Sequence, residues 1–169
     1  ITALREEVAR AKDAYVAAAD QASVQRKAAA ARLDTLVAVE LPPLKLDKAR
    51  FVTAVEDLSE ADWGPAGRDR VRFLVATNPG AEPGPLNKIA SGGEMSRFML
   101  ALKVVMAAVG AAGTYIFDEV DSGIGGPTAA AVGERLARLS ASRQIFVVTH
   151  APQVAARASH HYIVRKDGA

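Results

Sequence analysis

Two adjacent carboxylates follow a short apolar segment near the middle of the chain. Residues 114–117 read Thr-Tyr-Ile-Phe, and Asp118 and Glu119 come directly after them. Such a run predicts a buried strand, and ligands of open α/β sheets bind at the carboxyl ends of strands. Asp118 offers the oxygen ligands that Mg²⁺ prefers, and Glu119 is suited to deprotonate a water that attacks a phosphate. The alternative is a polar exit from the strand into solvent.

A pair of glycines stands at the start of a helix predicted for residues 91–109. Ser91 and Glu94 have the spacing of a capping box, in which two side chains satisfy N–H groups at the helix start. Capping does not account for Gly92 and Gly93, which weaken a first helical turn. Bare backbone N–H groups at the positive end of a helix dipole attract anions. The pattern therefore indicates phosphate docking, with plain capping as the alternative.

A second, mostly apolar segment spans residues 144–149, and His150 follows it directly. In a parallel sheet this histidine lies at the same edge as Asp118 and Glu119. Its imidazole is then suited to hydrogen-bond a terminal phosphate. A polar cap on a strand end is the simpler interpretation.

A glycine-rich loop at residues 121–126 lies between the two apolar segments. Asp121 and Ser122 begin this loop and add polar groups beside the two acids. Pro127 follows at a position typical of the first turn of a helix. We therefore expect the loop to border the same site.

Alternating strands and helices must position these motifs. Periodicity predicts helices at residues 46–58, 91–109, 127–139 and 151–158, a turn at 63–67, a loop at 78–85, and strands at 71–77, 114–117, 144–149 and 161–165. This alternation indicates the α/β class, with a mostly parallel sheet and flanking helices.

The first 41 residues contain neither Gly nor Pro, and their apolar positions follow heptad steps. The seam runs through Leu4, Val8, Ala11, Tyr15, Ala18 and Ala22, and Leu33 and Leu36 fit after a stutter. We expect a coiled-coil helix over residues 1–41 that needs a partner helix, and a second domain over residues 42–169 that begins at two prolines. One amphipathic helix packed on a globular body is the alternative.

Composition excludes several classes of protein. Hydrophobic residues make up 50% of the chain, enough for a packed core and too many for a disordered chain. The chain has no cysteine, so disulfides, cysteine-bound zinc and a cysteine nucleophile are excluded. No apolar stretch is long enough to span a membrane, and a cytoplasmic protein is expected. Because the chain begins at Ile1 inside a helical pattern, we also expect a fragment of a longer protein.

The order of these motifs resembles the C-terminal half of an ABC-type ATPase head. The resemblance implies that the Ser-Gly-Gly stretch is the signature motif and that Asp118 and Glu119 end the Walker B strand. It also implies that Asp121 lies in the D-loop and that His150 is the switch histidine.

The coiled-coil helix expected at residues 1–41 continues directly into the head, which is similar to the SMC group of chromosome and repair proteins among the ABC-type ATPases. Residues 77–80, 88–97 and 117–126 closely resemble the RecN family of bacterial double-strand-break repair ATPases. Met95, where the family often has Leu, is a conservative departure. The fold so implied is the C-terminal lobe of an SMC-type P-loop ATPase head with a coiled-coil stub.

The resemblance also implies cofactors, partners and roles. Two heads would enclose ATP, with Asp118 holding Mg²⁺, Glu119 activating water and His150 sensing the terminal phosphate. The opposing head would contribute its nucleotide-binding groups, namely Ser91, Gly92, Gly93, Glu94, Asp121 and Ser122. The same resemblance implies that the full-length protein is bacterial, is associated with the nucleoid and holds DNA.

The sequence has no Gly-x-x-x-x-Gly-Lys-Ser/Thr motif, so the loop that cradles nucleotide phosphates is not in this chain. The resemblance implies that an N-terminal Walker A lobe supplies it and that this chain alone neither binds ATP tightly nor hydrolyses it. A different SMC-type protein, a transporter ATPase subunit and a non-enzymatic coiled-coil scaffold remain alternatives.

DNA contact by this chain is a separate question. Arg68, Arg70 and Arg72 alternate with Asp69 and Val71, a spacing that in an extended chain puts the three arginines on one face, where they can touch phosphates. A solvated strand face explains them equally well. With a net charge of +2, we expect at most weak, salt-sensitive DNA binding.

Overall fold

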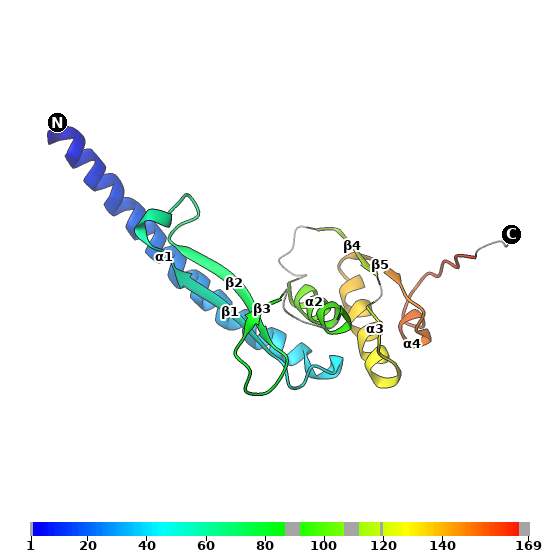
Figure 1. Cartoon of the computed structure of the whole chain (residues 1–169). Coiled ribbons are helices and arrows are strands. Elements are labelled where there is room, and N and C mark those ends of the chain that lie inside the picture. Colours follow the sequence, from blue (N-terminus) through cyan, green and yellow to red (C-terminus); the bar gives the residue numbers. More distant parts are fainter. Residues whose placement is uncertain (1, 87–91, 107–111, 119, 166–169) are drawn as a thin grey trace. The chain divides into compact units, whose positions relative to one another are not determined.

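The computed structural model describes residues 2–86, 92–106, 112–118 and 120–165 (Figure 1). The chain divides into two compact units, one made of Ile1–Ala38 with Arg50–Lys88 and the other of Val39–Ala49 with Ile89–Ala169. The sequence placed a domain boundary after residue 41, whereas the strands that follow this point pack with the N-terminal helix.

The first unit is a long helix with an antiparallel hairpin along it (Figure 1). Helix α1 spans Thr2–Glu40, and β1 (Arg50–Asp57) pairs with β2 (Asp69–Ala76) over its full length. The two-residue strand β3 (Gly84–Pro85) adds to the far side of β2.

The helix predicted for residues 46–58 is wrong, because β1 occupies most of this range. Val52, Thr53 and Val55 are β-branched and favour a strand. Each lies opposite a residue of β2, so the hairpin outweighs the helical spacing of the apolar positions. The strand predicted at residues 71–77 and the turn at 63–67 are confirmed.

Helix α1 buries a heptad stripe that is shifted by one residue from the predicted seam. Ala19, Ser23, Ala30 and Val37 are buried, whereas Leu4 and Val8 of the predicted seam are 65% and 59% exposed. The buried positions of α1 therefore face the hairpin of its own unit. The partner helix of a coiled coil remains a prediction for the exposed seam.

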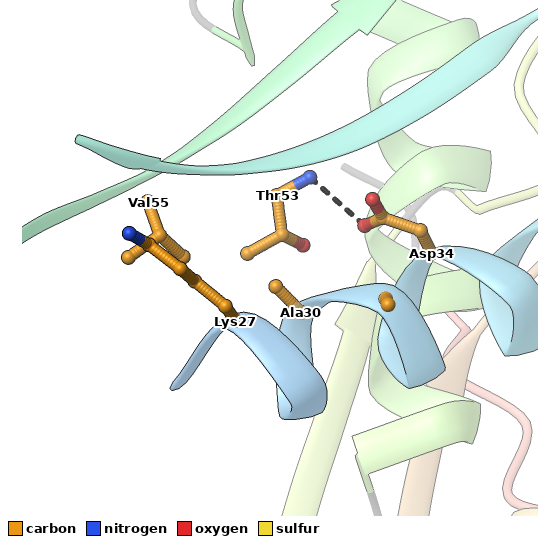
Figure 2. A pocket seen from close by; sticks show the side chains of 6 residues that line it. Lys27, Ala30, Asp34, Thr53 and Val55 are labelled. Carbon is orange, nitrogen blue, oxygen red and sulfur yellow. Dashed lines mark hydrogen bonds between the residues drawn. The ribbon is translucent and has the colours of Figure 1, made fainter. Parts of the chain in front are cut away.

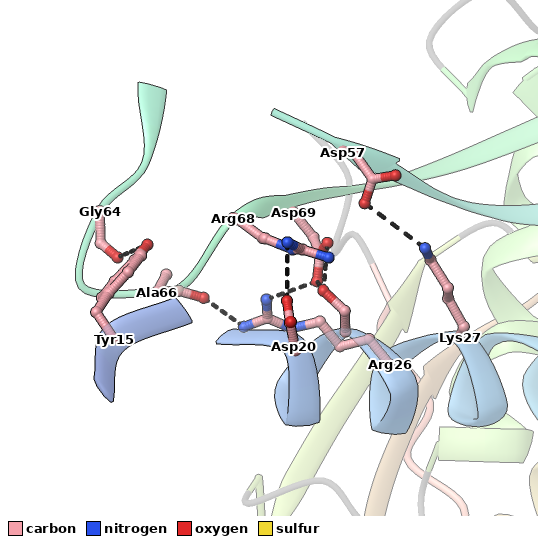
Figure 3. A network of polar contacts seen from close by, with 10 residues as sticks. Tyr15, Asp20, Arg26, Lys27, Asp57, Gly64, Ala66, Arg68 and Asp69 are labelled. Atoms are coloured by element: carbon pink, nitrogen blue, oxygen red, sulfur yellow. Dashed lines mark hydrogen bonds and ion pairs between the residues drawn. The ribbon is translucent and has the colours of Figure 1, made fainter. Parts of the chain in front are cut away.

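Polar contacts fasten the hairpin to α1 (Figure 3). The Asp69 side chain is fully buried, the Ser23 hydroxyl lies 2.7 Å from both of its carboxylate oxygens, and Arg26 Nη1 lies 3.2 Å from Oδ2. The hydrogen bond from Ser23, together with Arg26, lowers the pKa of Asp69 although burial opposes this. Asp57, opposite Asp69 across the hairpin, pairs with Lys27.

Asp69→Ala is expected to lower the free energy of unfolding of the chain by about 1–3 kcal/mol at pH 7, because the Ser23 and Arg26 donors lose their acceptor. The folded-state pKa of Asp69 lies below its ordinary value of 3.8, so this stability is present above that pH and disappears as the pH falls through the lower folded-state pKa. Urea unfolding followed by Trp63 fluorescence should show the difference from the wild type shrinking in acid. Asp57→Ala is the matched control, because this carboxylate is 66% exposed and its ion pair should contribute under about 1 kcal/mol. Equal losses of unfolding free energy in the two variants would contradict the conclusion that the buried Asp69 stabilises this unit more than the exposed Asp57.

In its described residues, the second unit contains a parallel strand pair and several helices (Figure 1). Its elements are α2 (Gly92–Met106), β4 (Thr114–Asp118), α3 (Gly126–Ser140), β5 (Gln144–Val148) and α4 (Pro152–Ala155). The predicted elements at 114–117, 127–139 and 144–149 are confirmed, as is the described part of the helix at 91–109, whereas the helix predicted at 151–158 is a single turn at Pro152–Ala155. The strand predicted at residues 161–165 is wrong, because the described part of the chain offers this segment no hydrogen-bonded neighbour.

The core of this unit includes the end of α1 and the turn after it. Leu41, Leu44, Phe98, Leu100 and Val132 are almost completely buried. Glu40, the last residue of α1, accepts hydrogen bonds from Arg135 Nε at 3.0 Å and Arg138 Nη2 at 2.8 Å. An ion pair therefore joins the end of α1 to α3.

Among the described residues, no helix is both long and apolar enough to cross a membrane.

Candidate functional site

The parallel pairing of β4 and β5 places two of the predicted site residues at one sheet edge. Asp118 ends β4 opposite Val148, the last residue of β5, and His150 follows two residues later. The crossover through α3 allows parallel strands, whose carboxyl ends then coincide. The geometry predicted for Asp118 and His150 is therefore present, whereas Glu119 lies outside the described residues.

Asp118 places an exposed carboxylate at this edge. Its side chain is exposed, and no group in the described part of the chain forms an ion pair or hydrogen bond with it. No three metal-binding side chains cluster among the described residues. One free carboxylate fits Mg²⁺, which commonly completes its coordination with phosphate oxygens and waters.

Asp121 points inward, away from solvent. Its carboxylate is fully buried, and Oδ2 accepts hydrogen bonds from Thr149 Oγ1 at 2.7 Å, His150 N at 3.2 Å and Ala151 N at 2.9 Å. Burial alone raises the pKa of Asp121, but the hydrogen bonds from Thr149 and the backbone outweigh it and lower the pKa below its ordinary value. Asp121 is thus a buried anion that ties its loop to the chain after β5.

His150 combines an anchored backbone with an exposed ring. Its side chain is 81% exposed, and Nδ1 lies 3.5 Å from Asp121 Oδ2. Thr149, which the sequence reasoning did not single out, donates to Asp121 and accepts from Ala151 N. In the sequence, the role of Thr149 was indicated only by its position directly before His150.

The two glycines of the α2 start have different surroundings. Gly92 has open space where a Cβ would stand, whereas a Cβ on Gly93 would lie 2.8 Å from the backbone oxygen of Ser122 and 3.2 Å from Arg97 Nη1. Gly93 therefore allows the glycine-rich loop to approach α2, and Gly92 is the one open to a ligand. Ser91 lies outside the described residues.

Gly93→Ala is expected to destabilise the second unit by about 1–3 kcal/mol, because the Ser122 carbonyl must move to admit the new Cβ. Gly92→Ala is the matched variant and should change stability by less than about 1 kcal/mol, since its Cβ meets nothing within 4 Å. Thermal unfolding of the two variants tests the distinction, and equal midpoints would refute it.

Arg97 is a buried cation one turn into α2 that the sequence reasoning missed. It is 8% exposed, its Nε has no hydrogen-bond partner, and burial lowers its pKa although Glu94 raises it. A charged residue beside Phe98 and Leu100 on the buried side of a helix was the available signal. Its Nη1 is near Gly93, so it adds positive charge close to the helix start.

The arginines considered for DNA contact are partly neutralised. Arg68 pairs with Asp20 at 2.8 Å, and Arg72 forms an ion pair with Glu56. Arg70 is exposed and lies opposite Glu56 in the hairpin register. In the described part of the chain, ion pairs therefore engage two of these three arginines, Arg68 and Arg72.

A shallow hollow of about 290 Å³ lies between α1 and β1 (Figure 2). Its lining includes Lys27, Asp34, Thr53 and Val55, and Asp34 accepts a hydrogen bond from the Thr53 backbone N–H. None of the site residues predicted from the motifs lines it.

Curated relatives match nearly the whole chain, although no protein-family model does. The DNA repair protein RecN of Vibrio cholerae is 45% identical over 98% of this chain and 30% of the relative. The RecN proteins of Rickettsia bellii (44% identical) and Treponema pallidum (43% identical) match 96% and 98% of the chain, over 29% and 30% of their own lengths. The chain thus spans about 30% of the length of these relatives.

Solved structures show the same fold at low sequence identity. The Smc head domain with a coiled coil and joint from Pyrococcus yayanosii has a TM-score of 0.57 and 18% identity, over 75% of this chain and 23% of that chain. The Pyrococcus furiosus Smc head domain with an extended coiled coil, bound to the C-terminal domain of ScpA, has a TM-score of 0.55 and 17% identity, over 75% and 30%. The chain therefore has the α/β fold of SMC head domains.

Proposed function

Because the chain belongs to the RecN family, of whose proteins it spans about 30%, we propose that it is the C-terminal lobe of an ATPase head that acts in DNA double-strand-break repair. Its task is to supply the Walker B, switch, D-loop and signature groups of an ATP site. The remaining parts of that site belong to the rest of the full-length protein and to a second head.

The observation that carries this proposal is the shared edge of β4 and β5. An exposed carboxylate at Asp118 and an exposed imidazole at His150 stand at the carboxyl ends of two hydrogen-bonded parallel strands. Ligands bind at this edge in open α/β sheets. A metal-binding acid and a phosphate-binding histidine there fit a nucleotide triphosphate.

Asp118, His150 and Glu119, which follows Asp118 in the sequence, would each have a distinct part in hydrolysis. Asp118 would hold Mg²⁺, which when bound offsets the negative charge of the phosphates. Glu119 would orient the attacking water and accept its proton. His150 would donate a hydrogen bond to the terminal phosphate, where negative charge is held during transfer.

The start of α2 would act on the nucleotide of the opposing head. Ser91, Gly92, Gly93 and Glu94 form this signature segment, and the open space at Gly92 leaves the backbone accessible to a phosphate. Ser122 is exposed in the adjacent D-loop and would face the same nucleotide. ATP would thereby join two heads, since each site needs groups from both.

The β4–β5 pair has an exposed apolar face, which supports the proposal that another part of the full-length protein covers this lobe. Ile116, Phe146 and Val148 are 69%, 47% and 59% exposed. Parallel sheets are normally covered on both faces. The Walker A lobe of the full-length protein is the expected cover, and it would also provide the missing phosphate-binding loop.

Membership of the RecN family also suggests what the full-length protein does with its coiled coil and with DNA. The exposed seam of α1 would pair with another coiled-coil helix of the full-length protein, and its cycle of ATP binding and hydrolysis would change how the protein holds DNA ends. A cytoplasmic, nucleoid-associated location fits this role.

ATP hydrolysis by the full-length protein, measured with and without linear double-stranded DNA, tests the proposal. We expect Mg²⁺-dependent turnover that DNA stimulates and added salt weakens. Turnover that DNA does not change would contradict the proposed role of the ATPase in DNA double-strand-break repair. No turnover under either condition would favour a non-enzymatic scaffold and overturn the proposal.

A further inference from the structure

Asp121 and Ser122, at the start of the D-loop, contact two other motifs: Asp121 contacts the segment around the switch histidine, and Ser122 contacts the start of α2. The Asp121 side chain accepts hydrogen bonds from residues 149–151, which include the backbone N–H of His150. The Ser122 carbonyl packs against Gly93 at the start of α2. Asp121 and Ser122 therefore lie where the signature helix and the switch histidine meet the D-loop.

The geometry of Asp121 does not suit direct contact with a nucleotide. Its side chain has no exposed surface, and the oxygen Oδ2 already serves three donors from Thr149, His150 and Ala151. An anion held this way also repels phosphate. The loop would reach a nucleotide through other groups, such as the exposed Ser122.

We infer that Asp121 is a positioning residue for His150, and this inference rests on the proposed ATPase function. The carboxylate fixes the backbone of residues 149–151 against the D-loop. The imidazole of His150 is consequently exposed to solvent beyond the end of β5, and its Nδ1 lies beside the carboxylate.

The orientation of the ring follows from this contact. Nδ1 lies 3.5 Å from Asp121 Oδ2, which leaves Nε2 as the nitrogen directed to a ligand. With Nδ1 beside the buried carboxylate, Nε2 can face a phosphate oxygen. A neutral residue at position 121 would keep some of the backbone anchoring and remove the carboxylate that faces the ring.

The test compares variants of the full-length protein by steady-state ATP hydrolysis. Asp121→Ala should lower kcat about tenfold or more and leave the KM for ATP within about twofold, as expected for a residue that orients a histidine. In a His150→Ala background the same change should have no further effect on kcat, because residues acting as one unit are not additive. Asp121→Asn should recover part of the activity, since its amide oxygen can still accept the bonds from His150 N and Ala151 N.

Asp69→Ala is the matched control, because it also removes a buried, hydrogen-bonded carboxylate but lies in the first unit. It should leave kcat unchanged. Amide hydrogen exchange adds a readout that does not need ATP. Exchange at His150 and Ala151 should be faster in Asp121→Ala than in the wild type or in Asp69→Ala.

Other outcomes would overturn the inference. A raised KM, or losses that multiply in the double variant, would mean that Asp121 contacts the nucleotide itself. Unchanged exchange at His150 and Ala151 would mean that the carboxylate does not hold this segment. A wild-type protein without ATPase activity but with the expected exchange pattern would instead refute the proposed function and leave the anchoring role of Asp121 supported.

Discussion

Glu119→Gln in the full-length protein is expected to lower ATP turnover by at least about 100-fold, because the water loses the group that accepts its proton. ATP binding should persist, since the amide has the size of the carboxylate and Asp118 remains. Heads that bind ATP without hydrolysing it should accumulate as dimers. Light scattering coupled to size-exclusion chromatography, with ATP and Mg²⁺, measures this directly.

Glu82→Gln is the matched control for this prediction. It makes the same chemical change at an exposed loop residue of the first unit, and turnover and assembly should stay at wild-type values. If Glu119→Gln hydrolyses ATP normally, or stays monomeric with ATP, the assignment of the Walker B pair is wrong.

Glu40→Gln should produce the largest loss of stability in the second unit. Glu40 and Arg135 each have side chains only 9% exposed, and the variant removes the buried anion of this guanidinium, which keeps only a longer contact with the exposed Glu134. Removing one partner of a buried ion pair costs about 3–5 kcal/mol. Urea unfolding of the chain, followed by circular dichroism of its helices, should show this decrease.

Glu134→Gln provides the comparison for Glu40→Gln. Glu134 also contacts Arg135, at 3.6 Å, but its side chain is 56% exposed. Water and salt screen such a contact, so the expected change is under about 1 kcal/mol. Similar losses for the two glutamates would show that burial does not govern this network.

The motif-bearing elements of the second unit were predictable because their signals are local. Unbroken apolar runs at residues 115–117 and 145–148 indicate strands, and the glycine-rich loop before Pro127 marks the next helix start. The relatives confirm the resemblance that the motifs at residues 88–97 and 117–126 predicted. Local signals also specified the order of strand and helix that makes β4 and β5 parallel.

The features that were missed depend on contacts between distant residues. The hairpin of β1 and β2 replaces a predicted helix because strand pairing is decided by a partner about 20 residues away. The buried stripe of α1 differs by one residue from the predicted seam, since alanines at neighbouring positions fit either face. The inward orientation of Asp121 depends on donors around residue 150, which no spacing near position 121 reveals.

The central claim is that this chain holds only part of an ATP site. Steady-state ATP hydrolysis by the 169-residue chain alone, measured beside the full-length protein at equal concentration, tests it most directly. We expect turnover by the full-length protein and none above background by the chain alone, because the sequence contains no phosphate-binding loop. Turnover by the chain alone that disappears in Glu119→Gln would contradict the claim.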